Sequence, residues 1–198
     1  MLNFLKSFNK EKEEENMNKI TLVTGGSRSG KSEYAEKILD GNDDVLYIAT
    51  AIVTDEEMKN RIDKHITRRN SNWNTYEGYK NLDECIKNSD KKNILLDCVT
   101  IMITNLMFEK NIDFDSLSLE EVDDMEKNIK NEFQKLILSS KENNKNLIMV
   151  TNEVGSGLVP EYRLSRIYRD IAGSVNQFIA SLSDEVYFVT CGLPLKLK

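Results

Sequence analysis

The 198-residue sequence lacks several features that would assign it to a specialised class of protein. Its three cysteines, Cys85, Cys98 and Cys191, include no C-x-x-C pair, so we expect reduced core thiols and neither a disulfide framework nor a metal site. No apolar run approaches the roughly 20 residues that cross a bilayer, and no signal peptide is visible. The net charge of −6 argues against a nucleic-acid-binding surface. These absences predict a cytoplasmic protein with no nucleic acid partner and no stable membrane insertion.

The first 18 residues differ from the rest of the chain. A charge run at residues 10–16, KEKEEEN, follows a short apolar cluster within residues 2–8. Such a segment buries too little surface to order itself, so we expect residues 1–18 to form a flexible, charged extension. An amphipathic arm that docks on a partner or a membrane surface is the alternative. Residues 19–198 are long enough to form a single α/β domain with a substantial core.

The most informative segment is a complete G-x-x-x-x-G-K-S motif that follows an apolar strand and precedes an amphipathic helix. In this context the glycines let backbone N–H groups surround phosphate oxygens, and the helix directs its positive end toward them. Lys31 can reach the β- and γ-phosphates, and the Ser32 hydroxyl can hold Mg²⁺. The motif predicts a nucleoside triphosphate site in the domain of residues 19–198, against the alternative of a glycine-rich turn without a ligand. The loop residues are Gly25, Gly26, Ser27, Arg28, Ser29, Gly30, Lys31 and Ser32.

Strands and helices are expected to alternate after this loop. Short continuous apolar runs predict strands, and runs of this kind are typical of a parallel sheet that is covered on both faces. Ser118-x-x-Glu121 is a capping box that predicts the start of a long helix, and Pro160 predicts the start of another. We therefore expect an α/β, P-loop NTPase-type three-layer fold with a mostly parallel central sheet and the ligand at the carboxyl ends of the strands. The predicted strands are residues 20–24, 45–50, 93–97, 146–151 and 185–190.

Acidic residues at two of these strand ends are candidate site residues. Asp97 closes the run at residues 93–97, where P-loop enzymes place an acid that orients Mg²⁺ or its water shell. The alternative is an acidic strand cap bonded to backbone amides. Asn152 and Glu153 precede a Gly155-x-Gly157 loop, and they either hydrogen-bond a ribose, base or substrate hydroxyl or belong to a flexible connection.

His65 is the only histidine of the chain. A capping box at Thr54-x-x-Glu57 predicts a helix through this residue, and helical spacing gathers three arginines around it. A lone histidine beside an apolar stripe is most often a core or interface residue. Arginines, however, suit phosphate oxygens, and they favour the neutral imidazole that can attack phosphorus. The arginines are Arg61, Arg68 and Arg69.

Several motifs together resemble the bifunctional adenosylcobinamide kinase/adenosylcobinamide-phosphate guanylyltransferase family of cobalamin biosynthesis. They are TGGSRSGKS at residues 24–32, YIATA at 47–51, the pattern R-I-x-x-H-x-x-x-R from Arg61 to Arg69 with Trp73 and Glu77 beyond it, LDCVT at 96–100, and VTNEVG at 150–155 followed by arginines at 163, 166 and 169. The resemblance spans about residues 20–198 in order. Only the N-terminal extension falls outside it.

The resemblance implies a two-step enzyme. ATP or GTP first phosphorylates adenosylcobinamide, and GMP from GTP then passes through a guanylyl-histidine intermediate to the cobinamide phosphate, giving adenosylcobinamide-GDP. His65 takes the position of the guanylylated histidine, and Lys31 is the second expected catalytic residue. Ser32 and Asp97 are expected to hold Mg²⁺, and a homo-oligomer, a trimer, is also implied. Nucleotide contacts beyond the phosphate loop map to Thr50, Ala51, Ile52, Ile66, Thr67, Arg68, Arg69, Glu77 and Asp97.

Two other functional classes are compatible with a P-loop. A single-function kinase for a small metabolite would account for the loop and Asp97, but it leaves His65 and its arginines unexplained. A regulatory P-loop module would hydrolyse nucleotide slowly and form no covalent adduct.

Overall fold

The computed structural model describes residues 18–52, 56 and 70–198. Within these residues one seven-stranded sheet has the order β3-β2-β4-β5-β1-β6-β7. The strands other than β7 pair in parallel, and β7 runs antiparallel to β6 at one edge. The predicted mostly parallel sheet is therefore confirmed. The strands are β1 (Ile20–Gly25), β2 (Val45–Ala49), β3 (Asn74–Glu77), β4 (Asn93–Asp97), β5 (Asn146–Asn152), β6 (Glu185–Thr190) and β7 (Leu193–Lys196).

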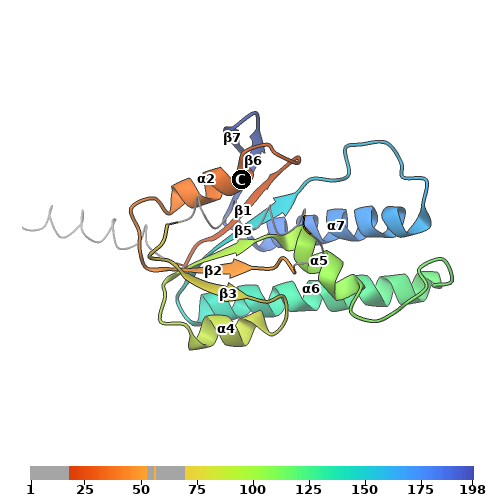
Figure 1. Cartoon of the computed structure of the whole chain (residues 1–198), viewed down its shortest axis with the longest axis horizontal. Coiled ribbons are helices and arrows are strands. Elements are labelled where there is room, and N and C mark those ends of the chain that lie inside the picture. The colour runs from red at the N-terminus through yellow and green to blue at the C-terminus, as the bar shows by residue number, and fades with distance from the viewer. Residues whose placement is uncertain (1–17, 53–55, 57–69) are drawn as a thin grey trace, which may run out of the picture.

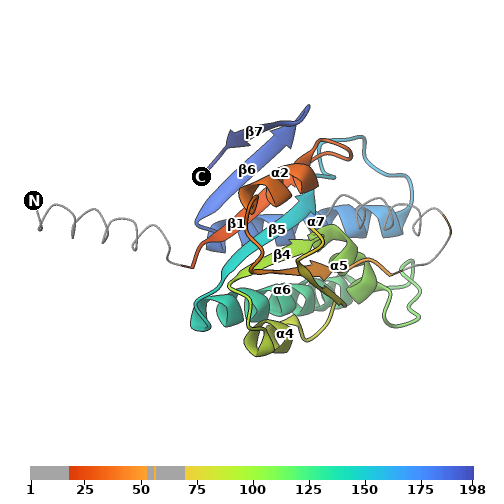
Figure 2. The same ribbon diagram turned by 60° about the vertical axis from the view of Figure 1, so that its left-hand side comes forward.

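Helices cover both faces of this sheet (Figures 1 and 2). One face carries α4 (Leu82–Asn88), α5 (Val99–Met107), α6 (Leu119–Glu142) and α7 (Arg163–Leu182), whose apolar residues form the larger core cluster. The other face carries α2 (Lys31–Ile38), which packs over the smaller cluster that includes Val23, Leu95 and Ile148. The inner strands β1, β2, β4 and β5 are buried from both sides, which explains their continuous apolar sequences.

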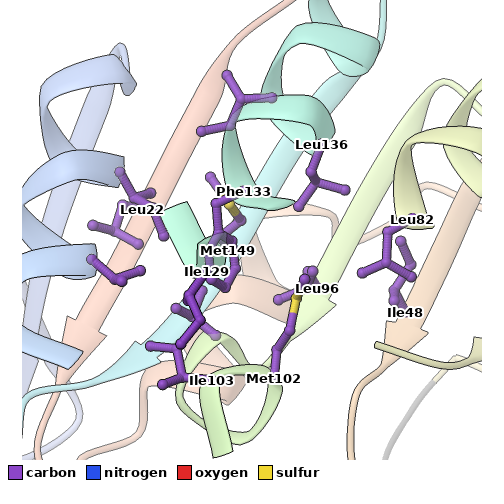
Figure 3. Close-up of a cluster of buried hydrophobic side chains, with 14 of the residues drawn as sticks. Leu22, Ile48, Leu82, Leu96, Met102, Ile103, Ile129, Phe133, Leu136 and Met149 are labelled. Carbon is purple, nitrogen blue, oxygen red and sulfur yellow. The ribbon is translucent and has the colours of Figure 1, made fainter. Parts of the chain in front are cut away.

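The long helix α6 begins and packs as the sequence predicts. The Ser118 hydroxyl accepts a hydrogen bond from the Glu121 N–H, and the Glu121 side chain accepts one from the Ser118 N–H, so the capping box is present. Figure 3 shows Ile129, Phe133 and Leu136 of this helix pointing into the core, with Phe133 against Met149 of β5. Burial of this stripe fixes α6 across the sheet.

Two predictions about local structure need correction, and four elements were not predicted. The last long helix begins at Arg163 with Tyr162 as its N-cap, so the prediction that Pro160 starts it was wrong. Pro160 instead belongs to the loop between β5 and α7, and the Arg166 guanidinium binds its carbonyl at 3.1 Å. The sequence also gave no prediction for β3, β7, α4 and α5. Cys191 is an exposed turn residue and not a core thiol, whereas Cys98 is buried.

The strand register brings the predicted site residues to one edge of the sheet. Ala49 of β2 pairs with Glu77 of β3 and with Asp97 of β4, and Gly25 of β1 pairs with Asn152 of β5. These residues end or nearly end their strands, and parallel strands present their carboxyl ends on the same side. The phosphate loop and the acidic strand ends therefore meet at this carboxyl edge.

Candidate active site

The phosphate loop joins β1 to α2 and folds back on itself. Gly30, the N-cap of α2, has a φ of 94°, a left-handed conformation that glycine adopts without steric cost. The Lys31 ammonium donates to the Gly26 carbonyl at 2.9 Å and so links the two ends of the loop. Since Gly30 offers no side chain to cap α2, the helix start can receive an anion.

The turn between β6 and β7 packs against the phosphate loop. The Gly192 N–H donates to the Ser29 carbonyl at 2.8 Å, and the Gly192 Cα lies 3.0 Å from the position that a Cβ on Gly30 would take. A Cβ on Gly25 would lie 2.3 Å from the Val189 carbonyl oxygen of β6. The Ser29 hydroxyl is buried here without a hydrogen-bond partner. The loop thus rests directly on the backbone of the C-terminal hairpin.

Lys31 is held in a largely buried position. The residue is 8% exposed, and this burial lowers the pKa of the ammonium, while the Asp97 carboxylate acts in the opposite direction. Burial raises the pKa of the Cys98 thiol to about 11, so this cysteine is an uncharged neighbour and not a nucleophile. Lys31 and Asp97, predicted from separate motifs, lie close enough to interact.

Asp97 is tied to the neighbouring strand β2 through its side chain and its backbone. Tyr47 donates a hydrogen bond to the carboxylate Oδ2 at 3.1 Å, and the Thr50 N–H donates to the Asp97 carbonyl at 3.1 Å. The Thr50 hydroxyl accepts from the Cys98 N–H and donates to the Cys98 carbonyl, both at 2.8 Å. The Thr50 side chain therefore joins the ends of β2 and β4, a contact that could not be predicted from the sequence. Its predicted contact with nucleotide stays a prediction.

Other predicted nucleotide contacts lie farther along the same edge. Glu77 ends the edge strand β3 and is exposed, and Ile52, just after β2, is 46% exposed. Ala51, which precedes Ile52 in the chain, is partly exposed. Several predictions lie outside the described residues. They are the extension at 1–17, the Thr54-x-x-Glu57 capping box, His65, and the neighbouring residues Arg61, Ile66, Thr67, Arg68 and Arg69.

Glu153 stabilises its own loop. Its carboxylate accepts hydrogen bonds from the Gly155 N–H at 2.8 Å and the Ser156 hydroxyl at 2.9 Å. Burial acts to raise the pKa of Glu153, but these hydrogen bonds outweigh burial and hold the pKa below its ordinary value. The Glu153 N–H also donates to the Gly25 carbonyl at 2.9 Å. Of the two interpretations from sequence, the structure therefore gives Glu153 a role in the connection, adjacent to the phosphate loop.

Two arginines of the last family-like motif hold loops. The Arg163 guanidinium donates to the Phe114 and Leu117 carbonyls, both at 2.5 Å, and so attaches the α5–α6 loop to α7. Arg166 binds the Pro160 and Glu161 carbonyls. Arg169 instead pairs with the adjacent Asp170. The first two arginines therefore fix the α5–α6 loop and the segment that precedes α7.

The described residues place limits on the kind of metal site. Among them no group of three or more histidine, cysteine, aspartate or glutamate side chains could hold a metal ion. Mg²⁺ in phosphate-transferring sites needs no such cage, since it is bound by one or two protein oxygens, water and substrate phosphates. The Asp97 carboxylate and the Ser32 hydroxyl fit that donor set. Within the same residues no helix has the length and apolar character required to span a membrane.

The chain is similar to known proteins over most of its length. A model of the family "Cobinamide kinase / cobinamide phosphate guanyltransferase" matches residues 21–197. A "Bifunctional adenosylcobalamin biosynthesis protein CobU" from Escherichia coli is 45% identical over 181 residues, covering 90% of this chain and 99% of the relative. The protein of the same name from Salmonella typhimurium is 44% identical with the same coverage. A CobP protein from Pseudomonas aeruginosa is 36% identical over 89% of this chain and 96% of its own length.

Proposed function

The chain belongs to the cobinamide kinase/cobinamide phosphate guanyltransferase family, and from this premise we propose the steps and the residues of its two reactions. It is a transferase of cobalamin biosynthesis that first phosphorylates adenosylcobinamide with ATP or GTP. It then transfers GMP from GTP to the cobinamide phosphate, giving adenosylcobinamide-GDP. The observation that carries the assignment to this site is the phosphate loop, with Lys31 held beside Asp97 at the carboxyl edge of the sheet.

The kinase step needs positioning and charge neutralisation. The substrate hydroxyl attacks the γ-phosphorus, the bond from this phosphorus to the β-γ bridging oxygen breaks, and the nucleoside diphosphate leaves. The loop from Gly25 to Ser32 holds the phosphates, and Lys31 compensates the charge on the transferring group. Mg²⁺, held by Ser32 and Asp97, supplies further charge stabilisation when bound.

The guanylyl transfer is proposed to use His65 as a nucleophile. A ring nitrogen attacks the α-phosphorus of GTP, a P–N bond forms, and pyrophosphate leaves. The phosphate oxygen of the cobinamide phosphate then attacks the same phosphorus and restores the histidine. His65 is the one imidazole in the sequence, so no other histidine of the same chain can replace it. Arg61, Arg68 and Arg69 are the expected charge partners, and Thr50, Ala51, Ile52, Ile66, Thr67 and Glu77 are the further nucleotide contacts.

The experiment is incubation of the wild-type protein and His65→Ala with GTP labelled at the α-phosphate. We expect a covalent label on the wild type that survives alkali and is lost in acid, since a phosphoramidate has that stability. His65→Ala should carry no label and form no adenosylcobinamide-GDP, while the kinase step remains at least in part. A labelled variant would remove His65 from the mechanism, and a wild type that carries no label would favour a single-function kinase.

Family resemblance also supports a homo-oligomer, a trimer, in the cytoplasm. Sedimentation analysis of the purified chain tests the trimer directly. A monomer at the protein concentration of the activity assay would contradict it.

A further inference from the structure

We propose that Tyr47 is a positioning residue for Asp97, whose carboxylate it orients toward the metal–nucleotide complex. The inference rests on the proposed function, in which Asp97 helps to hold Mg²⁺. Tyr47 was not among the residues expected at the site.

The register of the sheet explains how Tyr47 reaches Asp97. Tyr47 of β2 pairs with Leu95 of β4, two residues before Asp97. Side chains two residues apart point to the same face of a strand, so Tyr47, Leu95 and Asp97 share the face that α2 covers. Two residues of strand span about 6.6 Å, which the length of a tyrosine side chain can bridge. The phenol group lies 3.1 Å from the carboxylate Oδ2.

The backbone on either side of Asp97 is already fixed. Its carbonyl accepts from the Thr50 N–H, and the following residue, Cys98, is joined to the Thr50 hydroxyl by two hydrogen bonds. The Asn105 amide in turn donates to the Thr50 carbonyl at 2.7 Å. With the backbone held, the softest remaining motion is rotation of the carboxylate about its last torsion, for which the energy wells are broad. A hydrogen bond to one carboxylate oxygen restricts this rotation.

The chemistry of the donor suits an acidic group that binds a cation. A hydrogen bond to a carboxylate is stronger than one between neutral groups. A phenol provides it without adding a positive charge, whereas a lysine or arginine would compete with the metal. Tyr47 is 3% exposed, so its ring is fixed by packing and the hydroxyl has a defined position. Partners of this kind orient metal ligands, and their loss typically lowers metal affinity about 10- to 100-fold.

Tyr47→Phe tests the proposal because it removes the hydroxyl and keeps the buried ring. Tyr187→Phe is the matched control, since Tyr187 of β6 also donates to a carboxylate, Glu185, at 3.1 Å. The measurement is Mn²⁺ binding in the presence of a non-hydrolysable GTP analogue, followed by electron paramagnetic resonance. We expect about tenfold weaker Mn²⁺ binding for Tyr47→Phe and unchanged binding for the control. The Mg²⁺ concentration for half-maximal kinase rate should rise similarly, with the rate recovered at saturating Mg²⁺.

Asp97→Asn in the same assay separates this inference from the proposed function. If Asp97→Asn weakens Mn²⁺ binding and Tyr47→Phe does not, Tyr47 is only a structural residue and the inference is overturned. If Asp97→Asn binds Mn²⁺ as tightly as the wild type, Asp97 is not a metal ligand, and the proposed metal site fails together with the inference. Lower thermal stability of Tyr47→Phe with unchanged Mn²⁺ affinity also overturns the positioning role.

Discussion

Replacing Gly25 with alanine tests whether the C-terminal hairpin sets the shape of the phosphate loop. The added Cβ would lie 2.6 Å from the Ser29 hydroxyl oxygen and 2.3 Å from the Val189 carbonyl oxygen. The hydroxyl can rotate away. The carbonyl belongs to the backbone of β6, which pairs with β1 from Thr21 to Thr24. The new Cβ would lie about 1 Å closer to this oxygen than the ordinary contact distance of 3.4 Å. Either β6 moves away from β1 or the loop moves off the hairpin.

The size of the effect follows from this overlap. Inserting one carbon into a closely packed site costs about 1–3 kcal/mol, and here a backbone group must move, so we expect about 2 kcal/mol of lost unfolding free energy. Gly26→Ala is the matched control, because a Cβ on Gly26 meets no atom within 4 Å. Its unfolding free energy should stay within about 0.5 kcal/mol of the wild type.

Urea unfolding of the ligand-free proteins measures both changes, and a fluorescent GTP analogue reports the loop itself. If the binding conformation of the loop becomes about 1.4 kcal/mol less favourable in Gly25→Ala, affinity for the analogue falls about tenfold. Equal unfolding free energies for the two variants would refute the account of the hairpin as the support of the loop.

Two further substitutions test local features of the carboxyl edge. Ser29→Ala removes a buried hydroxyl without a partner, so urea unfolding should show an unfolding free energy about 1 kcal/mol higher than that of the wild type. The control is Ser140→Ala, which should lose stability because the Ser140 hydroxyl donates to the Leu136 carbonyl at 3.0 Å. A loss in Ser29→Ala would contradict this. Arg163→Gln should lower the unfolding free energy by about 2 kcal/mol, because two carbonyls lose a charged donor. Arg169→Gln, which removes a pair with the exposed Asp170, should change the unfolding free energy by about 0.5 kcal/mol or less. Equal losses in the two variants would contradict the role of Arg163 in holding the α5–α6 loop.

The elements that the sequence predicts well are those with a local pattern. Continuous apolar runs marked the five inner strands, and the capping box at Ser118 marked the start of α6. The edge strands gave no such pattern. All four residues of β3 and all four of β7 are exposed, and β7 contains Pro194. Burial produces the apolar signal, so strands at the two edges of a sheet lose it.

The start of α7 was wrong for a different reason. Proline favours the first turn of a helix, but it is also common in loops, and sequence alone does not separate these two uses. Here Arg166, one turn inside the helix, binds the carbonyls of Pro160 and Glu161 and keeps this segment in the loop. The contact joins residues only five and six positions apart, but residue type does not show whether an arginine side chain turns back onto the carbonyls before its helix or points to solvent.

The site divides in the same way between local and distant information. The phosphate loop is a contiguous motif, so its glycines, Lys31 and Ser32 could be predicted together. Its support from Gly192 could not, because more than 160 residues separate that turn from Ser29 in the sequence and a backbone hydrogen bond leaves no trace in residue type. Asp97 was predicted because it closes an apolar strand. The phenol that orients it comes from the middle of β2, where a buried tyrosine looks like any core aromatic.

Thr50 shows why a motif match alone does not assign a role to a side chain. A threonine at the end of a strand beside a phosphate loop can offer its hydroxyl to a nucleotide, and the resemblance predicts that contact. In the structure Thr50 is 1% exposed, and its hydroxyl donates its single proton to the Cys98 carbonyl. A nucleotide group that needed that proton would have to break the link between β2 and β4. Thr50 is therefore part of the scaffold that holds Asp97.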